Sequence, residues 1–150
     1  MSCDAAAAIF LWLAAATPQG GAAATLPPAA APPAAVAQEP LFADIVRKAS
    51  RLRSEVEGLR KSDRAPSKDF ATRVQELSDL DMQGHITLRE RGGDGDLKCI
   101  LKGISQDLPL KLEALGAAKT PKERDYALSE MGYLLNDNVE VITAPPAPPV

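Results

Sequence analysis

Apolar residues recur at helical spacing in four segments between residues 40 and 143. The clearest pattern lies in residues 40–62, where the apolar positions are separated alternately by three and four residues: Phe42, Ile45, Ala49, Leu52, Val56 and Leu59. This spacing places all six on one face of a helix, as the a and d positions of heptads do. Residues 68–90, residues from 94 or 96 to 115, and residues 120–143 also have helical spacing, and no segment alternates as a strand does.

Capping residues mark several ends of the predicted helices. Thr120 and Glu123 form a capping box, with Pro121 at the first helical position. Ser67 is the predicted N-cap of residues 68–90, and Gly92 and the glycine after it are predicted to end that helix. These signals predict helices whose ends are fixed by local chemistry.

The connections between the four predicted helices are short, about five residues each, which favours antiparallel neighbours. The expected fold is therefore all-α, an antiparallel up-down-up-down four-helix bundle with disordered Ala/Pro-rich termini. A long coiled coil within an oligomer is the alternative, because the heptad seams are unbroken. Pro109 lies inside the third helix and predicts a kink or a break near Asp107, since proline lacks a backbone donor.

The composition changes near residue 40. Residues 5–16 are uncharged and mostly apolar, which is typical of a signal-peptide core and too short to span a bilayer comfortably. Small residues at 22–24 offer a cleavage site, and Ala35, Val36 and Ala37 offer a second one further from the apolar core. The expected organisation is a signal peptide in residues 1–24, an Ala/Pro-rich linker in 25–39, the bundle in 40–143 and a Pro-rich tail in 144–150.

The leader predicts a periplasmic or secreted protein with no membrane span after signal removal. The residues before the apolar core include Asp4 and no Lys or Arg, which is atypical of a signal. A cytoplasmic protein with an Ala/Pro-rich tail is therefore the alternative.

Composition and charge restrict the class of function. The formal net charge of −3 gives no reason to expect a nucleic-acid partner. The chain has one histidine. No catalytic triad, paired-carboxylate cleft or zinc spacing is visible, so the sequence predicts a protein that is not an enzyme and holds no cofactor.

Tyr126 and Tyr133 lie seven residues apart and project away from the apolar stripe of the fourth helix. Tyrosine is enriched at the energetic centres of interfaces. Together with the basic residues Arg47, Lys48 and Arg51 of the first helix, they are the predicted contacts with a protein partner or with a second copy. The leading hypothesis is an exported helical bundle that acts as a protein-interaction or accessory module in the cell envelope.

Two further sites depend on single residues. Cys99 is predicted to lie opposite the apolar stripe of its helix, exposed and able to form a disulfide in an oxidising compartment. The alternative function is a haem or metal site inside a periplasmic bundle, with His85 and either Met82 or Met131 as ligands. The structural interpretation of the same region is an Asp81–His85 ion pair with Asn138 fixing the helix register, and the sequence favours this interpretation.

Overall fold

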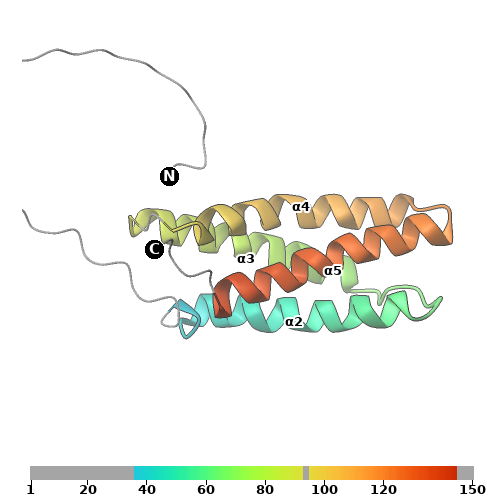
Figure 1. The fold of residues 1–150 in the computed structure, drawn as a ribbon, viewed down its shortest axis with the longest axis horizontal. Coiled ribbons are helices and arrows are strands. Elements are labelled where there is room, and N and C mark those ends of the chain that lie inside the picture. Colours follow the sequence, from blue (N-terminus) through green and yellow to red (C-terminus); the bar gives the residue numbers. More distant parts are fainter. Residues whose placement is uncertain (1–35, 93–94, 145–150) are drawn as a thin grey trace, which may run out of the picture.

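The computed structural model describes residues 36–92 and 95–144. Within these ranges the chain is all-helical, with no strand and four helices: α2 (Pro40–Arg60), α3 (Phe70–Glu90), α4 (Leu97–Ala117) and α5 (Pro121–Thr143). Figure 1 shows the four helices lying side by side along one long axis. Helices α3 and α4, α2 and α5, α4 and α5, and α2 and α3 pack against each other. The predicted leader, residues 25–35 of the linker and residues 145–150 lie outside the described residues.

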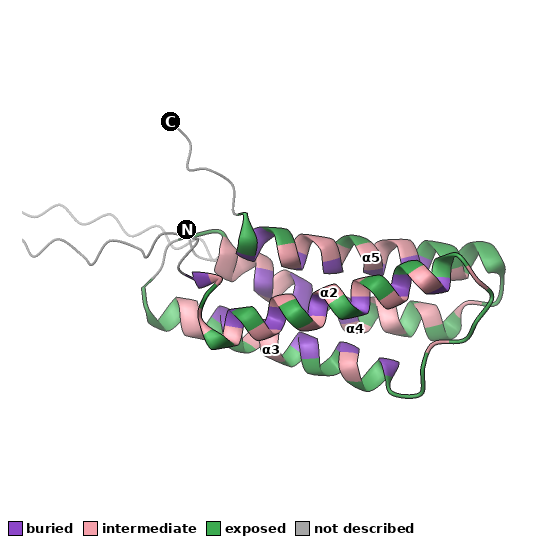
Figure 2. Ribbon diagram, turned by 90° about the horizontal axis from the view of Figure 1, so that it is seen from below, coloured by how far each residue is buried: buried purple, intermediate pink, exposed green. Residues whose placement is uncertain are grey.

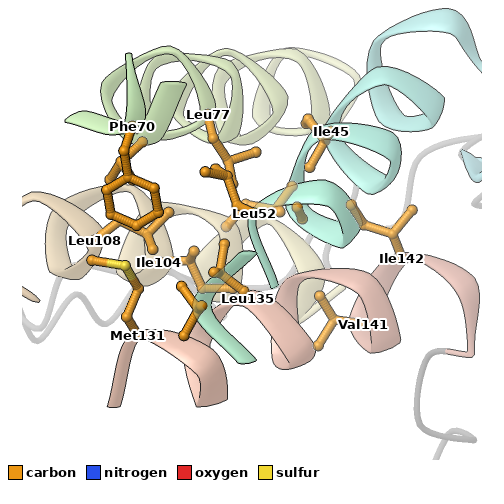
Figure 3. Packing of buried hydrophobic residues seen from close by; sticks show 14 of the residues in the cluster. Ile45, Leu52, Phe70, Leu77, Ile104, Leu108, Met131, Leu135, Val141 and Ile142 are labelled. Atoms are coloured by element: carbon orange, nitrogen blue, oxygen red, sulfur yellow. The ribbon is translucent and has the colours of Figure 1, made fainter. Parts of the chain in front are cut away.

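The core is aliphatic and continuous along the bundle. All six predicted seam residues of α2 are buried, from Phe42 to Leu59. Figure 2 shows that burial follows the inward face of each helix, and Figure 3 shows side chains from all four helices meeting in one cluster. The apolar stripes of α3, α4 and α5 also lie inward, although seven of their residues are only partly buried: Leu80, Leu88, Leu97, Ile100, Leu112, Leu115 and Leu134. None of the described helices has the length and apolar character needed to cross a bilayer.

Pro109 does not break α4, which is continuous from Leu97 to Ala117. Proline at position 109 cannot donate to the carbonyl of Ser105, four residues earlier. The hydroxyl of Ser78 on α3 donates to that carbonyl instead, at 2.6 Å, and both serines are buried. The predicted break is therefore wrong, and a side chain of the neighbouring helix replaces the missing donor. The kink, which was the other expectation, stays a prediction.

Ser67 does not cap α3, which begins at Phe70 with Asp69 as N-cap and no side-chain cap bond. The hydroxyl of Ser67 donates to Glu55 of α2 at 2.7 Å and accepts from Arg73 at 2.8 Å. The predicted cap is wrong because contacts between helices occupy this hydroxyl. The capping box of α5 is confirmed, with both reciprocal bonds between Thr120 and Glu123.

Side chains of other helices fix both ends of α2. At its start, Arg91 donates two hydrogen bonds to the carboxylate of Glu39, at 2.7 and 2.6 Å, and these bonds lower the pKa of Glu39. Val36, which the composition assigned to the linker, is buried against the core. At the other end, Arg124 of α5 donates to the backbone carbonyls of Leu59, Ser62 and Arg64.

Candidate interaction surface

Three large apolar side chains are strongly exposed on α4 and α5: Leu110 at 58%, Tyr126 at 66% and Tyr133 at 71% of their full accessible surface. Ile86 on α3 is the fourth exposed large apolar residue among those described, at 37%. Single exposed apolar residues are ordinary on protein surfaces. Three on two helices that pack against each other are informative, because clustered apolar exposure marks interaction sites.

One ion pair and one depression place Tyr126 and Tyr133 beside α4 at the level of Leu110. Lys111 of α4 pairs with Glu130 of α5 at 3.4 Å, which fixes the level of one helix against the other. Glu130 follows Tyr126 by four residues and precedes Tyr133 by three, so all three lie on the same side of α5. Leu110 precedes Lys111, and its helical neighbour Ala114 lines a shallow depression with Tyr126. We call Leu110, Tyr126 and Tyr133 the tyrosine face.

Carboxylates border the tyrosine face. On α5, Asp137 and Glu140 follow Tyr133 by four and seven residues, which keeps them on the same side of the helix. On α4, Asp107 is exposed one turn before Leu110. Within the described residues, only Glu130 of these carboxylates has an ion-pair partner. The border, which we call the acidic rim (Asp107, Glu130, Asp137 and Glu140), therefore carries a net negative charge.

The basic residues predicted as partner contacts on α2 are largely engaged within the chain. Arg47 pairs with Asp44 on the same helix, and Lys48 pairs with Glu76 of α3 at 3.0 Å. Arg51 is exposed and has no ion pair with a described residue. Because nearby carboxylates neutralise two of the three charges, this surface is a weaker docking candidate than the tyrosine face.

Cys99 is half-buried on α4, where the sequence predicted exposure, and it is not a free cysteine. Cys99 is in a disulfide in the structure, whereas disulfide formation in an oxidising compartment stays a prediction of the sequence. No catalytic role is assigned to it.

A buried polar pair lies between α3 and α5. Asn138 donates from its side-chain nitrogen to Oδ2 of Asp81 at 2.7 Å, and both residues are fully buried. Burial raises the pKa of Asp81 to about 8, although the hydrogen bond from Asn138 acts in the opposite direction. The carboxyl group is therefore mainly protonated at neutral pH, since an uncompensated buried charge is costly.

Protonation of Asp81 accounts for two atoms that otherwise have no partner. Oδ1 of Asp81 and Oδ1 of Asn138 are both buried without a hydrogen bond. A protonated Asp81 has an O–H donor, and Oδ1 of Asn138 is an acceptor on the group that already contacts it. A second hydrogen bond from the protonated Asp81 to Oδ1 of Asn138 would complete an acid–amide pair and satisfy both groups. The sequence interpretation of Asn138 as an inward residue is confirmed.

His85 is buried one turn after Asp81, and the two do not form the predicted ion pair. Nδ1 of His85 lies 2.7 Å from the backbone oxygen of Lys98 on α4. A carbonyl only accepts, so Nδ1 carries the proton and donates it. Helical spacing places Asp81 and His85 on one side of α3, but each forms its hydrogen bond with a residue of another helix.

Of the two residues proposed to hold a haem or metal with His85, Met131 lies far from it, whereas Met82 precedes it by one turn on α3. His85 lies at the level of Lys98, whereas Lys111 marks the level of Glu130, beside Met131. These two positions on α4 are about 20 Å apart at 1.5 Å per residue, and Figure 3 shows Met131 in the core near Leu108. Met82 is half-buried on the same helix as His85. In the described ranges, no group of three His, Cys, Asp or Glu residues could hold a metal ion.

Sequence reasoning missed Leu110 and the acidic rim. Leu110 lies one residue after Pro109 and opposite the apolar stripe of α4. This position on the helical wheel predicts that its side chain is exposed. The rim residues of α5 follow the tyrosines at intervals of three and four, which is also visible in the sequence. Only the contact between α4 and α5 shows that Leu110 and the residues of α5 belong to one surface.

Comparisons with known proteins do not assign the bundle to a family. No protein-family model matches the chain, no curated protein matches it, and no solved structure matches it.

Proposed function

We propose that the protein is an exported, non-enzymatic helical bundle that acts as a protein-interaction or accessory module in the cell envelope, and that the tyrosine face is its docking surface. The observation that carries the proposal is the exposure of Leu110, Tyr126 and Tyr133 on two adjoining helices. Tyrosine supplies a large contact area at low entropic cost, and it retains a polar group that tolerates water before binding.

The proposed arrangement of the helices is antiparallel, up-down-up-down. Contacts between neighbours support it. Ser78 and His85 of α3 bond to Ser105 and Lys98 of α4, so the residue numbers rise on one helix as they fall on the other. Between α2 and α5, Arg53 bonds to Asn136 and Arg60 to Asp125, in the same reversed order. In this arrangement α4 and α5, which pack against each other, are antiparallel neighbours and can form a two-helix docking surface.

Export is proposed from the apolar residues 5–16 and the small residues that follow them. The proposed compartment is the periplasm or the exterior. N-terminal sequencing of the protein from its own cells tests this part: a start between residues 22 and 26 supports export, and an intact Met1 end or loss of Met1 alone contradicts it.

Position-specific photo-crosslinking tests the docking surface. A photoreactive phenylalanine analogue replaces Tyr126 or Tyr133 in separate variants, and Gln83 on α3 serves as the exposed control position. We expect a discrete adduct of one defined mass at positions 126 and 133 and none at 83, in cells that express the protein at its natural level. Equal crosslinking at all three positions, or no adduct at 126 and 133, would contradict the proposal.

A further inference from the structure

The chemistry of the tyrosine face specifies its occupant, and this inference rests on the proposed function. We infer that the tyrosine face binds a basic amphipathic helix of a partner protein, with apolar anchors that contact Leu110 and the tyrosine rings and with Lys or Arg residues that contact the acidic rim. Charge, geometry and the rest of the bundle surface each support this occupant.

The charge of the surface favours a cationic partner. Asp107, Asp137 and Glu140 have no ion pair within the described part of the chain, and Lys111, which lies between the two helices, is paired with Glu130. A surface with uncompensated carboxylates accelerates association with a basic partner and discriminates against acidic ones. The faces of the tyrosine rings also attract Lys and Arg side chains by cation–π interaction.

The geometry of the surface fits a helix. Tyr126 and Tyr133 are separated by two helical turns, about 10 Å at 1.5 Å per residue. The Lys111–Glu130 pair places Leu110 at a level between them, on the adjoining helix. A partner helix with apolar residues at i, i+3 or i+4, and i+7 presents anchors at the same interval. Ala114, Ala117 and Ala127 line the depression beside Tyr126 and leave room for an anchor side chain, and Lys119 and Glu123 also line it, with opposite charges.

A second copy of this chain is a poorer occupant. Two tyrosine faces in contact would bring two acidic rims together, which costs free energy through like-charge repulsion. The basic surface of α2 offers little compensation, because Arg47 and Lys48 are already paired with Asp44 and Glu76. A different chain is therefore the better source of the complementary charge.

The tyrosine face carries its own spectroscopic reporters. The chain contains two tyrosines, and both belong to this face. Labelling the full chain with ¹³C-tyrosine therefore gives ring signals only from Tyr126 and Tyr133. Their chemical shifts report binding at this surface and ignore binding elsewhere.

The test is a titration of the labelled full chain with synthetic helices of about four turns. The probe is an amphipathic Leu/Lys peptide, and the two comparison peptides are its Leu/Glu counterpart and a Lys peptide of equal charge with Ser in place of Leu. We expect the Leu/Lys peptide to shift both tyrosine signals, with an affinity at least about tenfold above that of either comparison peptide.

Rim variants provide the second arm. Asp137→Asn with Glu140→Gln should weaken binding of the Leu/Lys peptide by about tenfold, since two charges at the border of an interface each contribute modestly. Asp79→Asn with Glu90→Gln removes the same charge from exposed positions of α3 and should leave the affinity unchanged.

The outcomes separate this inference from the proposed function. Absence of tyrosine shifts with the Leu/Lys peptide overturns the inference, and so does equal weakening by the α3 control. Stronger binding of the Leu/Glu peptide overturns the basic partner but leaves the docking surface in place. Crosslinks at positions 126 and 133 to a partner segment without Lys or Arg would likewise overturn the basic partner and leave the docking surface in place. Absence of those crosslinks would overturn the docking surface itself.

Discussion

The hydroxyl of Ser78 on α3 donates a 2.6 Å hydrogen bond to the backbone carbonyl of Ser105 on α4, the carbonyl that Pro109 leaves without its helical donor. The bond lies in the interior, where an unsatisfied carbonyl is costly. It couples the packing of α3 to the continuity of α4.

A double-mutant cycle tests this coupling. Ser78→Ala should lower the free energy of unfolding by about 1–3 kcal/mol, because the carbonyl of Ser105 loses its donor in a buried position. In a Pro109→Ala background, residue 109 regains an N–H that can donate to the same carbonyl, so Ser78→Ala should cost less by about 1 kcal/mol. Urea unfolding followed by circular dichroism measures all four proteins. An identical cost in both backgrounds would show that the two residues act independently.

The Asp81–Asn138 pair predicts a pH dependence of stability. The folded-state pKa of Asp81 is about 8 against an ordinary value of 3.8, so the folded protein holds a proton that the unfolded chain releases above pH 4. Its contribution to stability is therefore fully present below about pH 4 and is lost as the pH rises through about 8, by up to about 1.4 kcal/mol per pH unit. Unfolding free energies measured from about pH 4 to about pH 9 should fall accordingly.

Asp81→Asn isolates this contribution. Asparagine keeps an oxygen that accepts from Asn138 and adds an N–H that can donate to Oδ1 of Asn138 without ionising. The difference in stability between the variant and the natural protein should therefore grow in favour of the variant as the pH rises from about 5 to about 9. Carboxylates with lowered pKa values, such as Glu39 and Glu123, titrate identically in both proteins and cancel. A constant difference across this range would refute the protonated state of Asp81.

Gly84 lies where side chains of α2 and α4 approach the backbone of α3 closely. A Cβ at this position would lie 3.1 Å from Cδ1 of Leu101, 3.3 Å from Cε1 of Phe42 and 3.4 Å from Cδ1 of Ile45. Gly84→Ala should destabilise the fold by about 1–3 kcal/mol, because overcrowding exceeds the gain in helix propensity. The matched control is Gly103→Ala on α4, where a Cβ meets no atom within 4 Å. That variant should be more stable by about 0.5–1 kcal/mol, and thermal unfolding would distinguish the two signs.

Arg124 serves as a C-terminal cap for α2 although it belongs to α5. Its guanidinium donates to the carbonyls of Leu59 at 3.1 Å and Arg64 at 2.7 Å. Arg124→Ala should lower the free energy of unfolding by about 1–3 kcal/mol, since these are hydrogen bonds from a charged donor to groups at a helix end. The nearby exposed Lys122→Ala should change it by less than about 0.5 kcal/mol. Equal effects of the two substitutions would argue against the capping role.

Much of the fold was predictable because the helices are encoded locally. The seam of α2 and the capping box at Thr120 need only the spacing of residues along one helix, and both are confirmed. The failures share a different cause. Ser67 and Pro109 were read from local rules, whereas contacts with Glu55 and Ser78 on other helices decide what they do. A sequence pattern identifies a face but not the residue that the face meets.

The same limit applies to the candidate surface. The exposure of Tyr126 and Tyr133 follows from the pattern of α5 and is confirmed, but their role in binding stays a prediction. Leu110 joins them only because α4 packs beside α5. The partner of Asp81 was misassigned for a similar reason, because Asn138 lies on another helix.

Val36 extends the folded unit beyond the start of α2. Its side chain is buried against the core, and its carbonyl accepts from the backbone of Glu39 at 3.0 Å. A processing protease that cut after Ala37, the second of the two small-residue sites, would therefore excise a residue of the folded unit. A cut at residues 22–24 would leave that unit whole. If the proposed signal peptide is removed, cleavage before Val36 would therefore be favoured, because a mature protein that keeps Val36 is more stable.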